Sequence, residues 1–197
     1  MNEDDPPLQE LPASHEATVK TLVDMVRGEK SHRRVCAMDR RGWLLSRMDA
    51  RSRKIIGGLE LMYPTSRLVS GLWRAKGWGG WRPMSTPNIL QDTLRGLEGG
   101  EPVRVFHFGE RPGLGQRVLD DLAKTHPCVE PVGVRSVLDE LWGPENNQAL
   151  FQITDAKPDI LLVALPSPLV QEWVHAHAQL VPAKVVWGVG RGVFHKS

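Results

Sequence analysis

In the second half of the chain, short apolar runs alternate with longer segments in which apolar residues recur with helical periodicity. Short apolar runs predict strands at 103–108, 129–134, 159–165 and 183–190. Stretches of helical periodicity between them predict helices at 114–126, 136–142, 146–156 and 167–180. Strands that alternate with helices of this length are typical of βαβ units. We therefore predict a parallel sheet with helices on both faces, an α/β fold of Rossmann-like type.

The first half has a less regular pattern. We predict a helix at 14–27, a strand at 33–38, a helix or loop at 40–51, a straight or bent strand at 54–64, a helix at 66–77 and a loop at 77–85. A further helix should begin with Thr86 as its cap before Pro87 and end at Gly99-Gly100. Residues 1–13 are acidic and proline-bearing and read as a disordered tail. The rest, 14–197, should form one domain with lobes at about 14–100 and 101–197.

Composition and charge exclude several classes of protein. Hydrophobic residues make up 41% of the chain and charged residues 24%, which is ordinary for a globular protein. The net charge of +2 gives no reason to expect a nucleic-acid partner. Cys36 and Cys128 lack the spacing of a disulfide scaffold or zinc site, so we expect no metal, no cofactor and a reducing cytoplasm. The N-terminus does not resemble a signal peptide, and no apolar run is long enough to span a membrane.

Three predicted strands end on small or turn residues, at Gly109–Gly113, Pro166–Pro168 and Gly188–Gly192. In an open parallel sheet, ligands bind beyond the carboxyl ends of the strands. Small residues let a ligand approach the backbone, and a helix N-terminus offers free N–H groups to phosphate. These turns therefore fit a nucleoside diphosphate, or else they are ordinary connections between strand and helix.

The runs FHFGERPG, VEPVGV, PDILLVALPSP and AKVVWGVG occur in this order over residues 102–190. Together they resemble the WecG/TagA/CpsF family of glycosyltransferases. A weaker resemblance covers 33–90, where Ala37-Met38-Asp39, Tyr63–Ser66 and Arg82–Asn88 fall on family motifs.

The resemblance implies transfer of an N-acetylmannosamine-type or related sugar from a UDP donor to a lipid-linked acceptor in bacterial surface polysaccharide synthesis. It implies a cytoplasmic protein, peripheral at the inner membrane face, with a homo-oligomer or a partner glycosyltransferase as further expectations. The residues that it assigns to the substrate pocket are Ser85, Asn88, Gly109, Glu110, Pro168, Gln171, Gly188 and Gly190.

The chain departs from the family pattern at catalytic positions. The family's threonine falls on Ala37, its aspartate base falls on Thr65, and its glutamine falls on Val170 when no gap is allowed. The basic C-terminal appendage of many members is not expected, because the sequence stops at Ser197. A neutral threonine hydroxyl is no ordinary general base. Either the base has moved, with Asp39 or Glu110 as candidates, or the chain is a non-catalytic relative that binds nucleotide-sugar or scaffolds a partner.

Other signals have several readings. The stretch 27–54 is rich in arginine and lysine, which indicates a solvated face or an anionic membrane contact. Trp73, Trp78 and Trp81 beside basic residues fit core or subunit packing, a membrane interface or a sugar-stacking loop.

Three polar side chains need their own interpretation. Asp39 also reads as a surface residue paired with a neighbouring arginine. His107 reads as a core histidine. His175 and His177 are two positions apart on a predicted helix and do not share a face, which argues against a metal site.

Overall fold

The computed structural model describes residues 14–48, 50–78, 82–136, 141–192 and 194. The predicted tail at 1–13 and Trp81 lie outside them. The first part of the described chain runs through α1 (His15–Arg27), β1 (Arg33–Met38), α2 (Arg40–Met48), α3 (Ala50–Gly57), β2 (Leu61–Pro64), α4 (Arg67–Ala75) and α5 (Thr86–Leu97). The second part continues with β3 (Val103–Gly109), α6 (Leu114–Thr125), β4 (Val129–Arg135), α7 (Pro144–Ala156), β5 (Ile160–Ala164), α8 (Leu169–His177), a short 3-10 turn (Ala178–Leu180) and β6 (Val185–Gly188).

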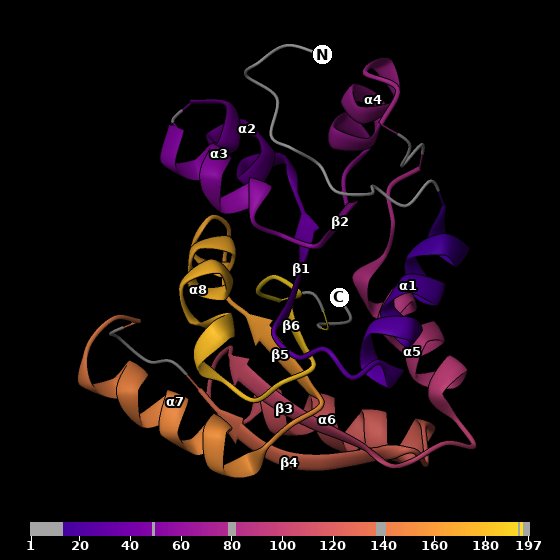
Figure 1. Cartoon of the computed structure of the whole chain (residues 1–197), viewed down its shortest axis with the longest axis vertical. Helices are drawn as coiled ribbons and strands as arrows, with labels where there is room; N and C mark the ends of the chain where they lie inside the picture. The colour runs from indigo at the N-terminus through magenta and orange to yellow at the C-terminus, as the bar shows by residue number, and fades with distance from the viewer. Residues whose placement is uncertain (1–13, 49, 79–81, 137–140, 193, 195–197) are drawn as a thin grey trace.

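All six strands belong to one parallel sheet in the order β2-β1-β6-β5-β3-β4 (Figure 1). The predicted α/β fold is therefore confirmed. The central strand β5 is fully buried along its length, as expected for an apolar run covered on both faces. The pairing of β1 with β6 joins the first half of the chain to the second within this sheet.

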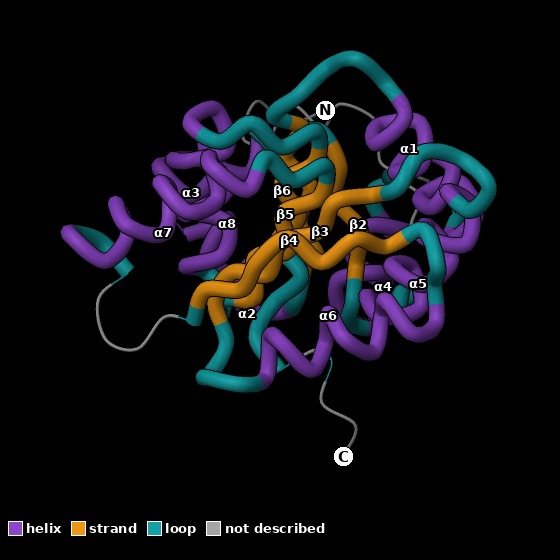
Figure 2. The backbone as a smooth tube through the Cα atoms, turned by 90° about the horizontal axis from the view of Figure 1, so that it is seen from below, coloured by secondary structure: helices purple, strands orange, loops and turns teal. Residues whose placement is uncertain are grey.

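Helices lie on both sides of the sheet (Figure 2). Between the helices and the sheet, buried apolar side chains form two separate hydrophobic layers. One layer contains apolar residues of α1, α5 and α6, such as Leu22, Leu94 and Leu119. The other contains residues of α2, α3, α4, α7 and α8, such as Trp43, Trp73 and Trp173. Trp73 is fully buried, which confirms the packing interpretation for that tryptophan.

The connections that leave β3 and β5 diverge. The chain leaves β3 through α6, whose Leu119 and Leu122 belong to the first layer. It leaves β5 through α8, whose Val170 and Trp173 belong to the second. Since β3 and β5 are neighbours, their connections open to opposite faces of the sheet. This is the arrangement that creates a ligand crevice at the carboxyl ends of the strands.

Two sequence-based predictions differ from the structure. The strand predicted at 54–64 is wrong in its first half, because Ile55 and Ile56 lie buried at the end of α3 and only Leu61–Pro64 form a strand. A short apolar run fits a buried helix turn as well as a strand, so its pattern alone does not decide. The helix predicted at 136–142 falls mostly outside the described residues, and Leu141 and Trp142 are not helical.

The cap predicted at Thr86 is displaced by one residue. Ser85 is the N-cap of α5, and Thr86 is its first helical residue. Pro168 is the N-cap of α8, after a cis Ser167-Pro168 peptide bond. In contrast, the predicted helix at 14–27 is confirmed, since Ser14 caps α1 by accepting a hydrogen bond from the Ala17 amide.

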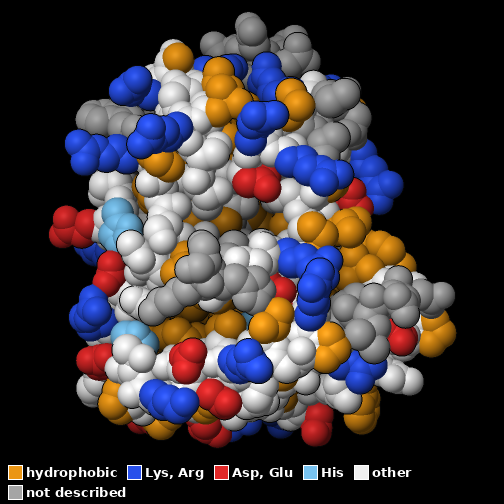
Figure 3. Space-filling view, turned by 180° about the vertical axis from the view of Figure 1, so that it is seen from behind, with side chains coloured by type: hydrophobic (Ala, Val, Ile, Leu, Met, Phe, Trp, Pro, Cys, Tyr) orange, Lys and Arg blue, Asp and Glu red, His pale blue; other side chains and the backbone are white. Residues whose placement is uncertain are grey.

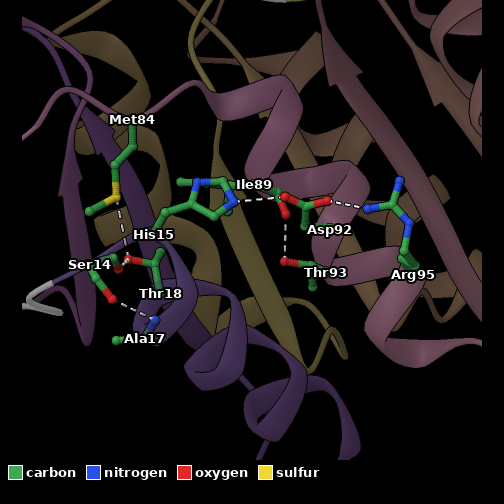
Figure 4. A network of polar contacts seen from close by, with 9 residues as sticks. All are labelled: Ser14, His15, Ala17, Thr18, Met84, Ile89, Asp92, Thr93 and Arg95. Atoms are coloured by element: carbon green, nitrogen blue, oxygen red, sulfur yellow. Dashed lines mark hydrogen bonds and ion pairs between the residues drawn. The ribbon is translucent and has the colours of Figure 1, made fainter.

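A polar network joins α1 to α5 (Figure 4). His15 Nε2 lies 2.8 Å from Asp92 Oδ2, and Arg95 also binds the Asp92 carboxylate. The His15 contact lowers the pKa of Asp92. Thr18 Oγ1 points at Met84 Sδ at 3.4 Å, so the network packs α1 against the segment that leads into α5. Among the described residues, no helix is both long and apolar enough to cross a bilayer.

Candidate functional site

The three small-residue turns predicted from the sequence meet at one edge of the sheet. Gly109, the last residue of β3, pairs with Ala164, the last residue of β5. Val163 of β5 pairs with Gly188, the last residue of β6. Asp39 and Thr65 directly follow β1 and β2 and lie at the same edge because all the strands are parallel. We call this region the carboxyl edge.

The turn between β3 and α6 needs a left-handed backbone. Gly109 has a φ of 102°, and a Cβ there would lie 2.6 Å from the carbonyl oxygen of Ala164. Glu110 has a φ of 60°, and its amide donates to that same oxygen at 3.2 Å. Gly113, the N-cap of α6, has a φ of 81° and offers no capping side chain. The close approach requires glycine at 109, and the turn leads directly into the N-terminus of α6.

Glu110 links this turn to the one after β6. Its carboxylate accepts a hydrogen bond from the amide of Gly192, and only 6% of the residue is exposed. Gly190 and Gly192 have φ values of 86° and 72°. Glu110 therefore joins the turn after β3 to the loop after β6, and this contact helps to fix the geometry of the carboxyl edge.

Gln171 is the most conspicuous polar side chain at the start of α8. It is 3% exposed, and its Nε2 donates to Ser167 Oγ at 3.2 Å. Its Oε1 has no hydrogen-bond partner among the described residues. A buried amide oxygen without a partner is costly, which indicates that a donor group from a ligand or water belongs there.

Asp39 and Gln171 meet at Gly42. A Cβ on Gly42 would lie 2.9 Å from Gln171 Nε2 and 3.2 Å from Asp39 Oδ1. Asp39 Oδ1 accepts a hydrogen bond from the Gly42 amide at 2.7 Å and so caps α2. Asp39 is half-buried, and its position is fixed by this cap. The glycine thus lets a carboxylate and an amide from α2 and α8 come together.

A small pocket adjoins this cluster. Its volume is about 10 Å³, and it is lined by Gly42, Ser52, Ile55, Ile56, Pro168, Gln171 and Glu172. Ligand pockets for larger molecules usually measure about 300–1,000 Å³. This pocket has room for about one water molecule, so a ligand of that size would have to lie along the open carboxyl edge.

Positions 37, 65 and 170 carry no catalytic group. Ala37 and Val170 are buried in the two apolar layers, at 9% and 1% exposure. Thr65 is half-buried, and both its amide and its hydroxyl donate to the Met38 carbonyl, at 3.0 and 3.2 Å. The glutamine at the site is thus Gln171, one position after the ungapped match to the family motif.

Ser85 and Asn88 are exposed at the N-terminus of α5. The Trp187 indole donates to the Tyr63 hydroxyl at 2.9 Å, and Tyr63 donates to Thr86 Oγ1 at 3.2 Å. This chain of contacts fixes α5 to β2 and β6. It holds Ser85 and Asn88 at the carboxyl edge without bringing them into the Asp39–Gln171 cluster.

Gly188 and Gly190 differ in what surrounds them. A Cβ on Gly188 would lie 2.7 Å from Cys36 Sγ and 2.8 Å from Val170 Cγ2, so Gly188 faces the core. Gly190 is half-buried in the following turn, where its positive φ favours glycine. The structure gives Gly188 a packing role, and Gly190 remains the candidate for contact with a ligand.

Two buried residues beneath the site, His107 and Cys36, are uncharged near neutral pH. Burial lowers the pKa of His107 to about 4, against the opposing effect of the Glu110 charge. His107 is fully buried, which confirms its interpretation as a core histidine. Burial raises the pKa of the Cys36 thiol to about 12, so this cysteine is no nucleophile near neutral pH.

His175 and His177 point to different surroundings. His175 Nδ1 lies next to Gly58, whereas His177 contacts Asn146 and the Trp173 carbonyl. In the described part of the chain, no three His, Cys, Asp or Glu side chains are grouped to hold a metal ion.

A second hollow lies at the opposite edge of the sheet. Its volume is about 360 Å³, and it is lined by Glu98, Gly99, Gly100, Pro102, Pro127 and Cys128. The helices α5 and α6 both end there, and helix C-termini disfavour anions. The carboxyl edge, with the N-termini of α5, α6 and α8, is the better site for a phosphate-bearing ligand despite its smaller pocket.

Sequence reasoning did not single out Gly42. The signal for Gly42 was a glycine within the otherwise helical run RRGWLLSRM, which often marks close packing. Nothing in the local sequence indicates that Gly192 would bind Glu110, because the two lie 82 positions apart.

The sequence model of the glycosyl transferase WecG/TagA/CpsF family matches residues 8–194. No curated protein matches the chain. The match covers nearly the whole sequence and all six strands that form the site. The chain therefore belongs to the WecG/TagA/CpsF family of glycosyl transferases.

Proposed function

We propose that this protein transfers a sugar of N-acetylmannosamine type, or a related one, from a UDP donor to a lipid-linked acceptor in bacterial surface polysaccharide synthesis. The family implies the class of reaction. The observation that carries the proposal is the meeting of Asp39 and Gln171 at the carboxyl edge, beside the turns that begin α6 and α8.

The donor diphosphate would lie along the turns after β3, β5 and β6. The positive dipole ends of α6 and α8 favour a doubly charged phosphate group. The amides of Val170 and Gln171 at the start of α8 already donate to the carbonyls of Pro166 and Pro168. Glu110 supports this arrangement indirectly, because it holds the Gly192 loop against the turn after β3. The Gln171 Oε1, which lacks a partner, would accept a hydrogen bond from a sugar hydroxyl or amide.

Asp39 would act as the general base. Its Oδ1 is fixed by the Gly42 amide, and Oδ2 would take the proton of the acceptor hydroxyl. The acceptor oxygen then forms a bond to C1 of the sugar as the bond from C1 to UDP breaks. The electron pair of that bond leaves with UDP, whose charge the helix N-termini stabilise. Thr65 cannot replace Asp39, since its hydroxyl already donates to Met38.

The test is turnover of a UDP-sugar panel with a lipid-pyrophosphate acceptor mimic, for wild type and Asp39→Asn. Asparagine also caps helices well, so the fold should survive. Loss of a general base typically costs about 10²- to 10⁴-fold in rate. Asp120→Asn, an exposed carboxylate on α6, is the matched control. Equal turnover of wild type and Asp39→Asn would exclude Asp39 as the base.

A second candidate function is nucleotide-sugar binding without transfer, in a regulatory or scaffolding member of the family. It is favoured because Thr65 stands where the family has its aspartate, and because Asp39 and Glu110 both make structural hydrogen bonds. Binding of UDP with no turnover across the donor panel would support this alternative over the first.

A further inference from the structure

The helices α2, α3 and α4 concentrate positive charge at one end of the molecule. Residues 40–76 contain nine Lys and Arg and two acidic residues, so this segment carries +7 although the whole chain carries +2. Figure 3 shows Lys and Arg side chains gathered with hydrophobic ones over the top of the molecule, where these helices lie in Figure 1.

Helix α4 presents an exposed face that is both apolar and basic. Val69 and Trp73 are fully buried against the core, which fixes the rotation of the helix. Leu68 and Leu72 lie one turn apart on the outer face and are 52% and 41% exposed. Arg67 and Arg74 are exposed beside them, two turns apart. Exposed leucines at this spacing, flanked by arginines, are typical of helices that lie in a membrane interface.

Helix α2 adds to the same end of the molecule. Leu44 is 57% exposed, and the exposed Arg40 and Arg41 lie one turn before it. Trp43 connects α2 to α4, since its ring packs edge-on against Trp73 with centroids 5.9 Å apart. We call the exposed side chains Arg40, Arg41, Leu44, Arg67, Leu68, Leu72 and Arg74 the basic–apolar surface.

From this composition we infer that the basic–apolar surface binds an anionic lipid membrane. The positive charge complements acidic headgroups, and the leucines can enter the interface between headgroups and acyl chains. Because α2 and α4 begin directly after β1 and β2, a bound molecule would hold its carboxyl edge next to the lipid surface. The inference stands on the surface itself and does not depend on the proposed reaction.

The test is co-sedimentation of the full chain with vesicles of phosphatidylcholine alone or mixed with phosphatidylglycerol. We expect binding to the mixed vesicles that weakens as salt is raised, because surface charges are screened. Arg67→Gln with Arg74→Gln should weaken binding about fivefold for each charge removed. Arg117→Gln with Lys124→Gln removes the same charge from α6 and should leave binding nearly unchanged. Equal loss in both pairs would show a general charge effect and overturn the inference.

The apolar part has its own matched pair. Leu68→Ser with Leu72→Ser should reduce vesicle binding at least tenfold, since it removes two side chains that would leave water. Phe151→Ser with Leu180→Ser, also exposed but outside the surface, should have little effect. All four residues are exposed, so the variants should fold.

Two further outcomes would contradict the inference. One is no binding to the mixed vesicles at low salt. The other is concentration-dependent dimerisation in sedimentation velocity that Leu68→Ser with Leu72→Ser abolishes, which would assign this surface to a second copy of the chain. UDP binding in solution should be the same for every variant, so the result is independent of the proposed function.

Discussion

At the residue scale, a single position decides how this chain compares with its family. Val170 is buried beside Gly188, whereas Gln171 turns toward Ser167 and Gly42. The ungapped sequence match places the family's glutamine on Val170, whereas the amide side chain that reaches the carboxyl edge in the structure is that of Gln171. The rotation of α8 decides which of the two neighbours packs beside Gly188, and no local pattern predicts it.

Substitution of Gln171 should affect ligand binding, whereas substitution of Val170 should affect stability. We expect Gln171→Met to leave the melting temperature nearly unchanged, because methionine keeps the volume, and to weaken UDP-sugar binding. Val170→Gln should lower the free energy of unfolding by about 1–3 kcal/mol, since it buries an amide without a partner. Urea denaturation and calorimetric titration measure the two effects. A destabilised Gln171→Met variant with normal binding would show that Gln171 is structural.

His107 should make stability depend on pH. Its pKa is about 4 in the folded protein, below the usual 6.5, so the unfolded chain binds more protons between these values. Stability is therefore lost as pH falls below about 6.5. From pH 7 to pH 5, the wild type should lose about 2 kcal/mol more free energy of unfolding than His107→Leu. Urea denaturation at the two pH values tests this, and equal losses would contradict it.

At the scale of elements, the sequence predicts the second half well because its strands are short, mainly apolar runs and its helices have one apolar face. The strands β3, β4, β5 and β6 and the helices α6, α7 and α8 all overlap their predicted ranges. The first half is harder, since Ile55-Ile56 before a glycine pair fits either a strand or the end of a helix. Their burial at the end of α3 comes from tertiary packing.

The contacts of Tyr63 test how α5 is held. Burial raises the pKa of Tyr63, so its hydroxyl stays protonated and both donates to Thr86 and accepts from Trp187. Tyr63→Phe should lower the free energy of unfolding by about 1–3 kcal/mol, because it leaves the Trp187 indole N–H buried without an acceptor. Urea denaturation measures the loss. A change below about 0.5 kcal/mol, as at an ordinary surface site, would show that the Tyr63 hydrogen bonds do not stabilise the attachment of α5.

At the scale of the whole molecule, the order of the strands assembles the site. The sequence predicts a parallel sheet and three ligand-facing turns, but it does not show that β1 pairs with β6 or that β3 pairs with β5. Those pairings bring Asp39, Glu110 and Gln171 to one edge from distant parts of the chain. Long-range pairing is set by packing of complete helices on the sheet, which a local pattern does not contain.

The turn after β6 should matter for binding more than for folding. Gly190 has a φ of 86°, where a side chain costs about 1–2 kcal/mol. We expect Gly190→Val to remain folded by circular dichroism but to lose nucleotide binding, since the turn beside the Glu110–Gly192 contact is displaced. Gly77→Val, which has a φ of 72° in the connection after α4, is a control for strain alone. Normal UDP affinity in a folded Gly190→Val variant would remove this turn from the site.

The most direct measurement of the central claim is thermal unfolding with and without UDP. If the carboxyl edge binds a nucleoside diphosphate, UDP at 100 times its dissociation constant adds about 2.7 kcal/mol. For a domain of this size, that raises the melting temperature by about 5–10 °C. We expect this shift for wild type and Asp39→Asn, and none for Gly190→Val. No shift with millimolar UDP or UDP-sugar, or the same shift in Gly190→Val, would contradict a donor site at the carboxyl edge.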